Sequence, residues 1–313
     1  MRSHSFWSGN EIVLRRSAIS LATNRRRYPE GRARLHESLK SNGFTGDFVS
    51  WQPGTFPPGC PEHFEVPFAF KPFCFLEAQK RNLELVLWLD SSCIVIRNLD
   101  PIFSTIEEQG YLLFKNRHHV VGEWSSDEAL QKLGLSRAQA MIVPEVNAAV
   151  IGLNLKHPIA AAFLQKWYEE ARDGVAFRGT REKPGTREAY DDLKWNKSKR
   201  ASADPRVRGH RHDQTVAGVL ACRLGMTLTS EGLQSYSQKH RGIGWKTLIL
   251  IDREVTRKDC ARERRSLATL AQIHRDRYLG HLVDLSLNPL RKVESVGGNL
   301  LRSVAARQAR HRR

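Results

Sequence analysis

The sequence of 313 residues lacks the cysteine patterns that would tie a small fold together. Its five cysteines are odd in number and widely scattered, and none stands in a C-x-x-C pair, so neither a disulfide scaffold nor a thiolate zinc site is expected. No stretch approaches the roughly 18 apolar residues that a membrane-spanning helix needs. Arg15 and Arg16 interrupt the first apolar patch, so no signal peptide is expected. These absences predict a cytoplasmic protein with reduced thiols.

Acidic residues are also scarce. Asp and Glu number 33 against 50 Lys and Arg, which gives a formal net charge of +17. The excess is uneven, because residues 253–313 hold fifteen Lys or Arg and only six Asp or Glu. Such a charge favours anionic partners, namely nucleic acid, anionic lipid surfaces or phosphorylated small molecules, and does not choose among them. The apolar share of 40% suffices for a sizeable core.

Apolar runs and helical patterns alternate along the chain, which predicts an α/β fold with a mainly parallel sheet flanked by helices. Ligands of such sheets bind beyond the carboxyl ends of the strands. Strands are expected at 17–22, 47–51, 85–89, 94–96, 111–114 and 148–153, and helices at 24–40, 71–82, 157–174 and 210–226, with short helices within 127–141.

Composition divides the chain into parts. Residues 1–250 carry the alternating pattern and are expected to form one domain, and 251–313 to form a basic, mostly helical extension. Within the domain, 175–209 is polar, charged and too long for an ordinary connection, which predicts a mobile loop. A loop of this kind beside a site could close over a ligand and exclude water, although charged loops are often only solvated.

The stretch VLWLDSSCIVIRN carries an apolar strand directly into the carboxylate of Asp90, followed by Ser91 and Ser92. An acid at a strand end is costly to bury unless a cation or a hydrogen-bond donor meets it. In this position it can hold a divalent cation or accept hydrogen bonds from sugar or ribose hydroxyls. The alternative is an acid that caps the following turn.

Five stretches in the same order give this acid a context. WLDSSCIVIRNLDPIF resembles the strand and D-x-D turn of nucleotide-sugar glycosyltransferases of the GT-A fold. SLATNRRRY, FAFKPFCFLEA, EVNAAVIGLNL and HRHDQTVAGVLA resemble their nucleotide-binding loop, the helix before the acidic motif, the strand that lines the sugar pocket and a late D-Q helix. The stretches are spread over most of the range 17–235. The resemblance implies a GT-A-like, Rossmann-like domain.

The resemblance also implies site residues. Asp90 would act at the reacting centre, and Asp213 is the candidate for the catalytic base. The donor would be bound by Thr23, Asn24, Tyr28, Lys71, Asp90, Ser91, Ser92, Asn147 and Gln214, with Asp213 and Gln214 facing the sugar or the acceptor.

Simpler interpretations stand beside these roles. Asn147 could make strand-end hydrogen bonds, and Asp213 could be a helix N-cap. Lys71 could be a solvated lysine in the first turn of its helix.

A divalent cation, Mn²⁺ or Mg²⁺, is the cofactor that the resemblance implies, held by Asp90, Ser92 and His240. Ser92 replaces the second acid of the motif, and a hydroxyl is a poorer ligand for a hard cation than a carboxylate. His240 belongs to SQKHRGIGWK, an imperfect match to the late H-x-x-G-x-x-K of some members, and could equally be a surface histidine.

The function so implied is transfer of a sugar from a nucleotide-diphosphate donor to a glycan or glycolipid acceptor, in surface polysaccharide synthesis. The basic C-terminal segment would contact an anionic membrane at its inner face. One rival is a degenerate protein that binds a sugar nucleotide without turnover. The other is a basic nucleic-acid-binding protein, against which stands the lack of any finger, helix-turn-helix or RNP signature, so no specific nucleic acid is expected.

Overall fold

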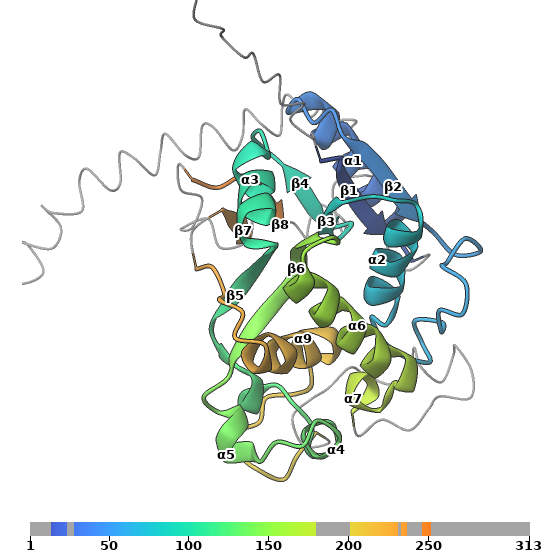
Figure 1. The fold of residues 1–313 in the computed structure, drawn as a ribbon. Coiled ribbons are helices and arrows are strands. Elements are labelled where there is room, and N and C mark those ends of the chain that lie inside the picture. The colour runs from blue at the N-terminus through green and yellow to red at the C-terminus, as the bar shows by residue number, and fades with distance from the viewer. Residues whose placement is uncertain (1–13, 24–27, 180–200, 231–232, 237–245, 252–313) are drawn as a thin grey trace, which may run out of the picture.

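A computed structural model describes residues 14–23, 28–179, 201–230, 233–236 and 246–251 (Figure 1). No helix among these residues is long and apolar enough to cross a membrane. The expected basic extension at 251–313 falls, apart from its first residue, outside the described residues.

The central sheet contains five strands, four of which run in one direction. Their order is β2 (Asp47–Trp51), β1 (Arg16–Leu21), β3 (Leu85–Leu89), β6 (Pro144–Asn154) and β5 (Tyr111–Val120). β1 is parallel to β2 and to β3, whereas β6 is antiparallel to both β3 and β5. The expected α/β class with a mainly parallel sheet is confirmed.

The middle strand β3 is apolar at every position because both of its faces are covered. Its five residues are all fully buried. Trp88 belongs to the apolar core on one face of the sheet, and Leu87 belongs to the core on the other. Successive side chains of a strand point to opposite faces, so this one run of five residues contributes to both cores.

Helices pack against each core, which gives three layers (Figure 1). On the face to which Leu87 points lie α1 (Tyr28–Ser41) and α3 (Asp100–Gln109). On the face of Trp88 lie α2 (Phe70–Lys80), α6 (Pro158–Asp173) and α9 (His212–Arg223). α6 ends at Gly174, as the sequence predicts, because its C-cap has a φ of 80° that glycine adopts without strain.

A second, smaller sheet is separate from the central one, and its strand β4 (Cys93–Val95) packs against α1. The smaller sheet contains β4, β8 (Ile249–Ile251) and β7 (Gln234–Tyr236), with β4 antiparallel to β8 and β7 parallel to it. The strand expected at 94–96 is therefore present, but in a separate sheet. The reason is the tight turn after β3, which redirects the chain out of the central sheet at once.

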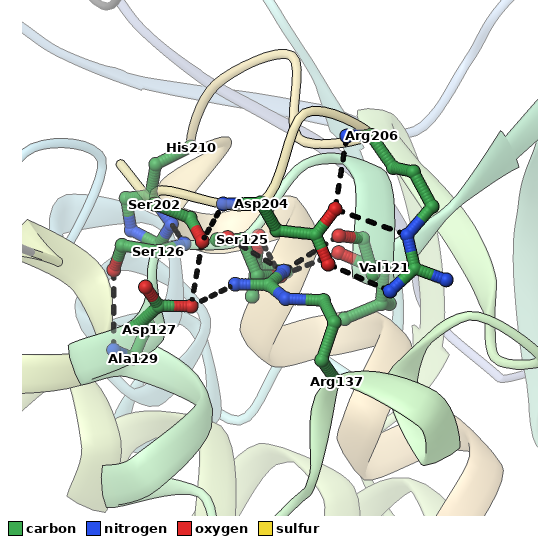
Figure 2. Close-up of polar contacts among 12 residues, drawn as sticks. Val121, Ser125, Ser126, Asp127, Ala129, Arg137, Ser202, Asp204, Arg206 and His210 are labelled. Atoms are coloured by element: carbon green, nitrogen blue, oxygen red, sulfur yellow. Dashed lines mark hydrogen bonds and ion pairs between the residues drawn. The ribbon is translucent and has the colours of Figure 1, made fainter. Parts of the chain in front are cut away.

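Short helices extend the lower end of the molecule in Figure 1. They are η1 (Val121–Glu123), α4 (Asp127–Lys132), α5 (Arg137–Ala140) and α7 (Val175–Arg178). The Arg137 guanidinium donates to the carbonyl oxygens of Gly122, at 2.6 Å, and Ser125, at 2.9 Å (Figure 2). It therefore holds the backbone before α4 against α5.

A set of charged and polar side chains continues from this arginine along the surface (Figure 2). Arg137 pairs with the Asp127 carboxylate at 2.6 Å, which also accepts a hydrogen bond from Ser202 at 2.9 Å. The Asp204 carboxylate pairs with Arg206 at 2.6 Å. We call these residues the outer network: Asp127, Arg137, Ser202, Asp204 and Arg206.

Both ends of the loop expected at 175–209 have a defined structure. Phe177 of α7 is buried, and so is Ala201, whose carbonyl oxygen accepts a hydrogen bond from the amide of Asp127 at 3.0 Å. These contacts restrict the predicted mobility to the part between the ends. Residues 180–200 lie outside the described residues, and there the prediction is untested.

Candidate active site at the carboxyl edge of the sheet

Two neighbouring strands end at one edge of the sheet, and a third passes it. β1 and β3 are parallel, so both end here, whereas the antiparallel β6 starts beyond this edge and has Val150 opposite Leu89. The amide of Asp90 donates to the carbonyl oxygen of Ala149 at 2.9 Å, which continues the ladder one residue past β3. This geometry places the start of EVNAAVIGLN beside the end of VLWLD.

The Asp-Ser-Ser sequence forms a tight turn. The amide of Cys93 donates to the carbonyl oxygen of Asp90 at 2.8 Å, and Ser91 and Ser92 are both buried. The turn therefore positions Asp90 at the end of β3 while it starts β4.

Helix α1 and the residue that follows it fix this turn through three side chains spaced four residues apart. Arg34 reaches the carbonyl oxygen of Ser92 at 3.4 Å. Ser38 accepts from the amide of Val95, and Asn42 donates to its carbonyl oxygen, both at 3.0 Å. Residues four apart lie on one face of a helix, so one face of α1 binds the backbone that follows Asp90.

Three charged side chains meet behind the turn, and we call them the inner cluster: Lys71, Asp90 and Asp213. The Lys71 Nζ lies 2.7 Å from Asp213 Oδ2 and 3.2 Å from Asp90 Oδ1. It also donates to the carbonyl oxygen of Ala148 at 2.7 Å. The side chains of Lys71 and Asp213 are 2% and 3% exposed. The lysine is therefore buried in the core, where it is the common counter-ion of Asp90 and Asp213.

Burial and charge oppose each other in the inner cluster. Burial would lower the pKa of Lys71, but the carboxylates of Asp213 and Asp90 together raise it above its ordinary value. Burial raises the pKa of Asp213, against the opposing effect of Lys71. Lys71 is therefore charged at neutral pH.

Asp90 is the open member of the inner cluster. Its side chain is 28% exposed, and its Oδ1 accepts from the Trp88 indole at 2.8 Å and forms an ion pair with Lys71 at 3.2 Å. The carboxylate is thus oriented by two donors and still reaches solvent. The bonds that orient it run to these side chains, which corrects the simpler interpretation of Asp90 as the cap of its own turn.

Two other simple interpretations are wrong. Lys71 is not a solvated lysine, because α2 turns it inward against β3 and α9. Asp213 is not an N-cap, because Arg211 takes that position and Asp213 lies in the first turn of α9 with its carboxylate on Lys71. Both interpretations rest on the local pattern of a helix start, whereas the observed positions depend on contacts between side chains of α2, α9 and the end of β3.

Asn147 is buried in β6, and its Oδ1 accepts from the amide of Ala149 at 3.1 Å. This bond agrees with the simpler interpretation of Asn147 and still places the residue at the site edge. Thr23 follows β1 at the same edge, and its buried Oγ1 has no hydrogen-bond partner among the described residues. Tyr28 is the half-buried first residue of α1. Asn24 and His240 lie outside the described residues.

A second polar group, which the sequence analysis missed, lies at the start of β6. Glu145 is fully buried, and its Oε2 accepts from Arg211 at 2.6 Å and from Asn116 at 2.7 Å. Arg211 stacks on Trp124 at 3.6 Å, and Asn116 also reaches Gln214 at 3.4 Å. The group joins β5, β6 and the first turn of α9.

Burial raises the pKa of Glu145 to about 7, although Arg211 and Asn116 act in the opposite direction. The charge of Asp213 adds to the rise, so the two acids affect each other. A signal for Glu145 was present in the sequence: it stands two residues before Asn147 in an apolar strand, and so on the same face.

The described residues do not fit a divalent cation at Asp90. Nowhere in the described part of the chain do three His, Cys, Asp or Glu side chains gather closely enough to hold a metal ion. Asp90 Oδ1 already has two donors, and Ser92 is buried. A divalent cation at this edge would need most of its oxygen ligands from water or from the phosphates of a bound donor.

No protein-family model matches the sequence, and no curated protein matches it. Solved structures of glycosyltransferases have a similar arrangement. One acts in glycosylation of the major capsid of PBCV-1: TM-score 0.41, 16% identity, covering 76% of this chain and 93% of that one. The galactosyltransferase LgtC has a TM-score of 0.41 at 13% identity over 83% and 94% of the two chains. Mouse xyloside xylosyltransferase 1 has 0.42 at 10% identity over 80% and 99%. At such low scores and identities, the chemistry of this chain must be argued from its own residues.

Proposed function

We propose that the protein is a GT-A-type glycosyltransferase that moves a sugar from a nucleotide-diphosphate donor to a glycan or glycolipid acceptor. The observation that carries the proposal is the position of Asp90. It ends a fully buried strand, is oriented by Lys71 and Trp88, and remains open to solvent at the edge where ligands of α/β sheets bind.

The stretches that resemble glycosyltransferase motifs supply the residues of this edge. Lys71, Asp90, Asn147 and Asp213 come from four such stretches that are far apart in the sequence. Lys71 touches Asp90, Asp213 and the residue after Asn147. A set of weak motifs gains support when its members assemble at one site.

The chemistry of transfer suits these groups. An accessible carboxylate such as Asp90 can accept hydrogen bonds from the hydroxyls of a bound sugar or ribose. Transfer breaks the bond between the sugar and its diphosphate through a cation-like sugar centre, which a nearby carboxylate stabilises. Thr23, Asn24, Tyr28, Ser91, Ser92 and Gln214 remain proposed contacts of the donor.

The roles of two residues are refined here. Lys71 Nζ donates to the carbonyl oxygen of Ala148 and forms ion pairs with both carboxylates of the inner cluster, so we propose that it positions Asp90 and does not bind the diphosphate. Asp213 is buried against Lys71, so it positions the lysine. Action of Asp213 as a base would require its carboxylate to leave Lys71.

A second candidate function is favoured by that same burial of Asp213. With the candidate base enclosed, a protein that binds a sugar nucleotide without turnover is consistent with the site. Release of nucleoside diphosphate from UDP- or GDP-sugars distinguishes the two functions, since only the enzyme produces it.

A thermal-shift screen with UDP- and GDP-sugars tests the proposal. A donor at ~100 times its Kd stabilises the fold by about 2.7 kcal/mol, which raises Tm by several degrees. Asp90→Ala should abolish this rise. Asp100→Asn is the matched control, because Asp100 is an acid of the same stretch that pairs with Arg16 on the surface. If none of the nucleotide sugars raises Tm, the proposal is refuted.

Contact of the basic segment 253–313 with an anionic membrane is a further part of the proposal, and its residues lie outside the described part of the chain. Flotation with anionic vesicles should carry the full chain and leave a variant without this segment behind. Equal flotation of both would refute the contact.

A further inference from the structure

The position between the two acids of the inner cluster is filled by a side chain of the protein. The Lys71 ammonium forms ion pairs with Asp90 and Asp213 and donates a hydrogen bond to the carbonyl oxygen of Ala148. Its Nζ also lies 5.4 Å from the centre of the Phe68 ring and 5.6 Å from that of Trp88. Aromatic faces attract a cation at this range, so the pocket is built for a positive charge.

A divalent cation shared by Asp90 and Asp213 would need the same space. Oxygen ligands lie 2.0–2.6 Å from such ions. In this structure the facing oxygens of Asp90 and Asp213 are instead 3.2 and 2.7 Å from a nitrogen, which are distances of hydrogen-bonded ion pairs. A dication placed beside the ammonium would also be repelled by it.

A second cation lies near the turn, where Arg34 of α1 reaches the carbonyl oxygen of Ser92 at 3.4 Å. The carboxylates of Asp90 and Asp213 share one buried cation, Lys71.

From these contacts we infer that the Lys71 ammonium fills the position that a divalent cation bridging Asp90 and Asp213 would need, and that binding of a nucleoside diphosphate at this edge does not require such a cation. The second half of this inference rests on the proposed function, and the first half does not. Lys71 is then a built-in cation, meaning a positive charge that the protein itself supplies at this edge and that does not depend on a bound metal ion.

The test measures binding of Mn²⁺ itself. For the wild-type protein, the electron-paramagnetic-resonance signal of free Mn²⁺ should be undiminished by the full-length chain. The affinity for UDP, measured by calorimetry, should be equal with Mn²⁺ and with EDTA. One Mn²⁺ bound per wild-type chain and lost in Asp90→Ala would overturn the inference.

The variant Lys71→Met should convert the inner cluster into a site that responds to Mn²⁺. Lys71→Met leaves two carboxylates around an uncharged side chain, which should lower Tm by roughly 10 °C. Added Mn²⁺ should then restore several degrees, because it can replace the missing charge. In the matched control, Lys71→Met with Asp213→Asn, the response to Mn²⁺ should disappear. A folded Lys71→Met protein that ignores Mn²⁺ would contradict the inference.

The two proposals fail separately. If Lys71→Met does not fold, the measurements on the wild-type protein decide. If UDP does not bind under any condition, the donor proposal fails, while the Mn²⁺ titrations still test Lys71 as the built-in cation.

Discussion

The inner cluster and the outer network both consist of short ion pairs, but they differ in burial. Lys71 and Asp213 are 2% and 3% exposed at 2.7 Å, whereas Arg206 and Asp204 are 61% and 21% exposed at 2.6 Å. Ion pairs of nearly the same length therefore differ in how much they contribute to the free energy of unfolding. Water and salt screen the outer pair, while removal of one inner partner leaves a buried charge without compensation.

The two regions also differ in how the chain builds them. Asp204 and Arg206 are two residues apart and meet within one turn. The inner cluster joins α2, the end of β3 and α9. Each of its ion pairs can therefore form only when these elements are packed in their final positions. A buried pair of this kind specifies one arrangement of helices, whereas the outer pair specifies only a local bend.

Asp213→Ala should have the largest effect on the free energy of unfolding. It leaves the buried Lys71 with one carboxylate fewer, and loss of one partner of a buried pair costs about 3–5 kcal/mol. Urea denaturation of the two proteins measures the difference.

A double-mutant cycle refines this result. Lys71→Met should cost a similar amount alone, and the double variant should be far less destabilised than the sum, because no charge is left unpaired. Additive losses would mean that the two side chains act independently, and the contrast between the regions would fail.

Glu145 gives a buried acid whose effect depends on pH. Its pKa is about 7 in the folded chain and 4.5 ordinarily, so the folded state binds its proton more tightly. As pH rises from 4.5, ionisation favours the unfolded chain, and the loss is complete above pH 7. The free energy of unfolding of the wild-type protein should therefore fall by roughly 3 kcal/mol over this range, relative to that of Glu145→Gln. Urea titrations of both proteins at several pH values test it, and parallel curves would contradict the prediction.

Arg206→Ala should have the smallest effect. Its guanidinium meets Asp204 on the surface, where the interaction is screened. The urea midpoint should be unchanged at moderate salt. A loss comparable with that of Asp213→Ala would show that exposure does not separate the two regions.

The sequence predicts elements whose signal is local. β3 and α6 could be located because an unbroken apolar run and a 3.6-residue period each reflect the burial of that segment alone. The direction of β6 could not be predicted, since an apolar strand has the same pattern whichever way it runs. The placement of β4 in a second sheet depends on α1 and β8, which its own residues do not encode.

The site shows the same division. Asp90 could be predicted because a carboxylate after a buried strand is unusual in itself. The sequence near Lys71 could not distinguish a solvated lysine from a buried one. Its burial depends on Asp90 and Asp213, which come much later in the chain. Glu145 was missed because its partners Arg211 and Asn116 come from other elements.

The order of synthesis acts on the inner cluster. A ribosome makes Lys71 and Asp90 long before Asp213, so a nascent chain contains the lysine with only half of its counter-charges. Lys71 can be buried against both of its carboxylates only after α9 has been synthesised and has docked. Burial of this one lysine therefore links the packing of α2 to a helix made about 140 residues later.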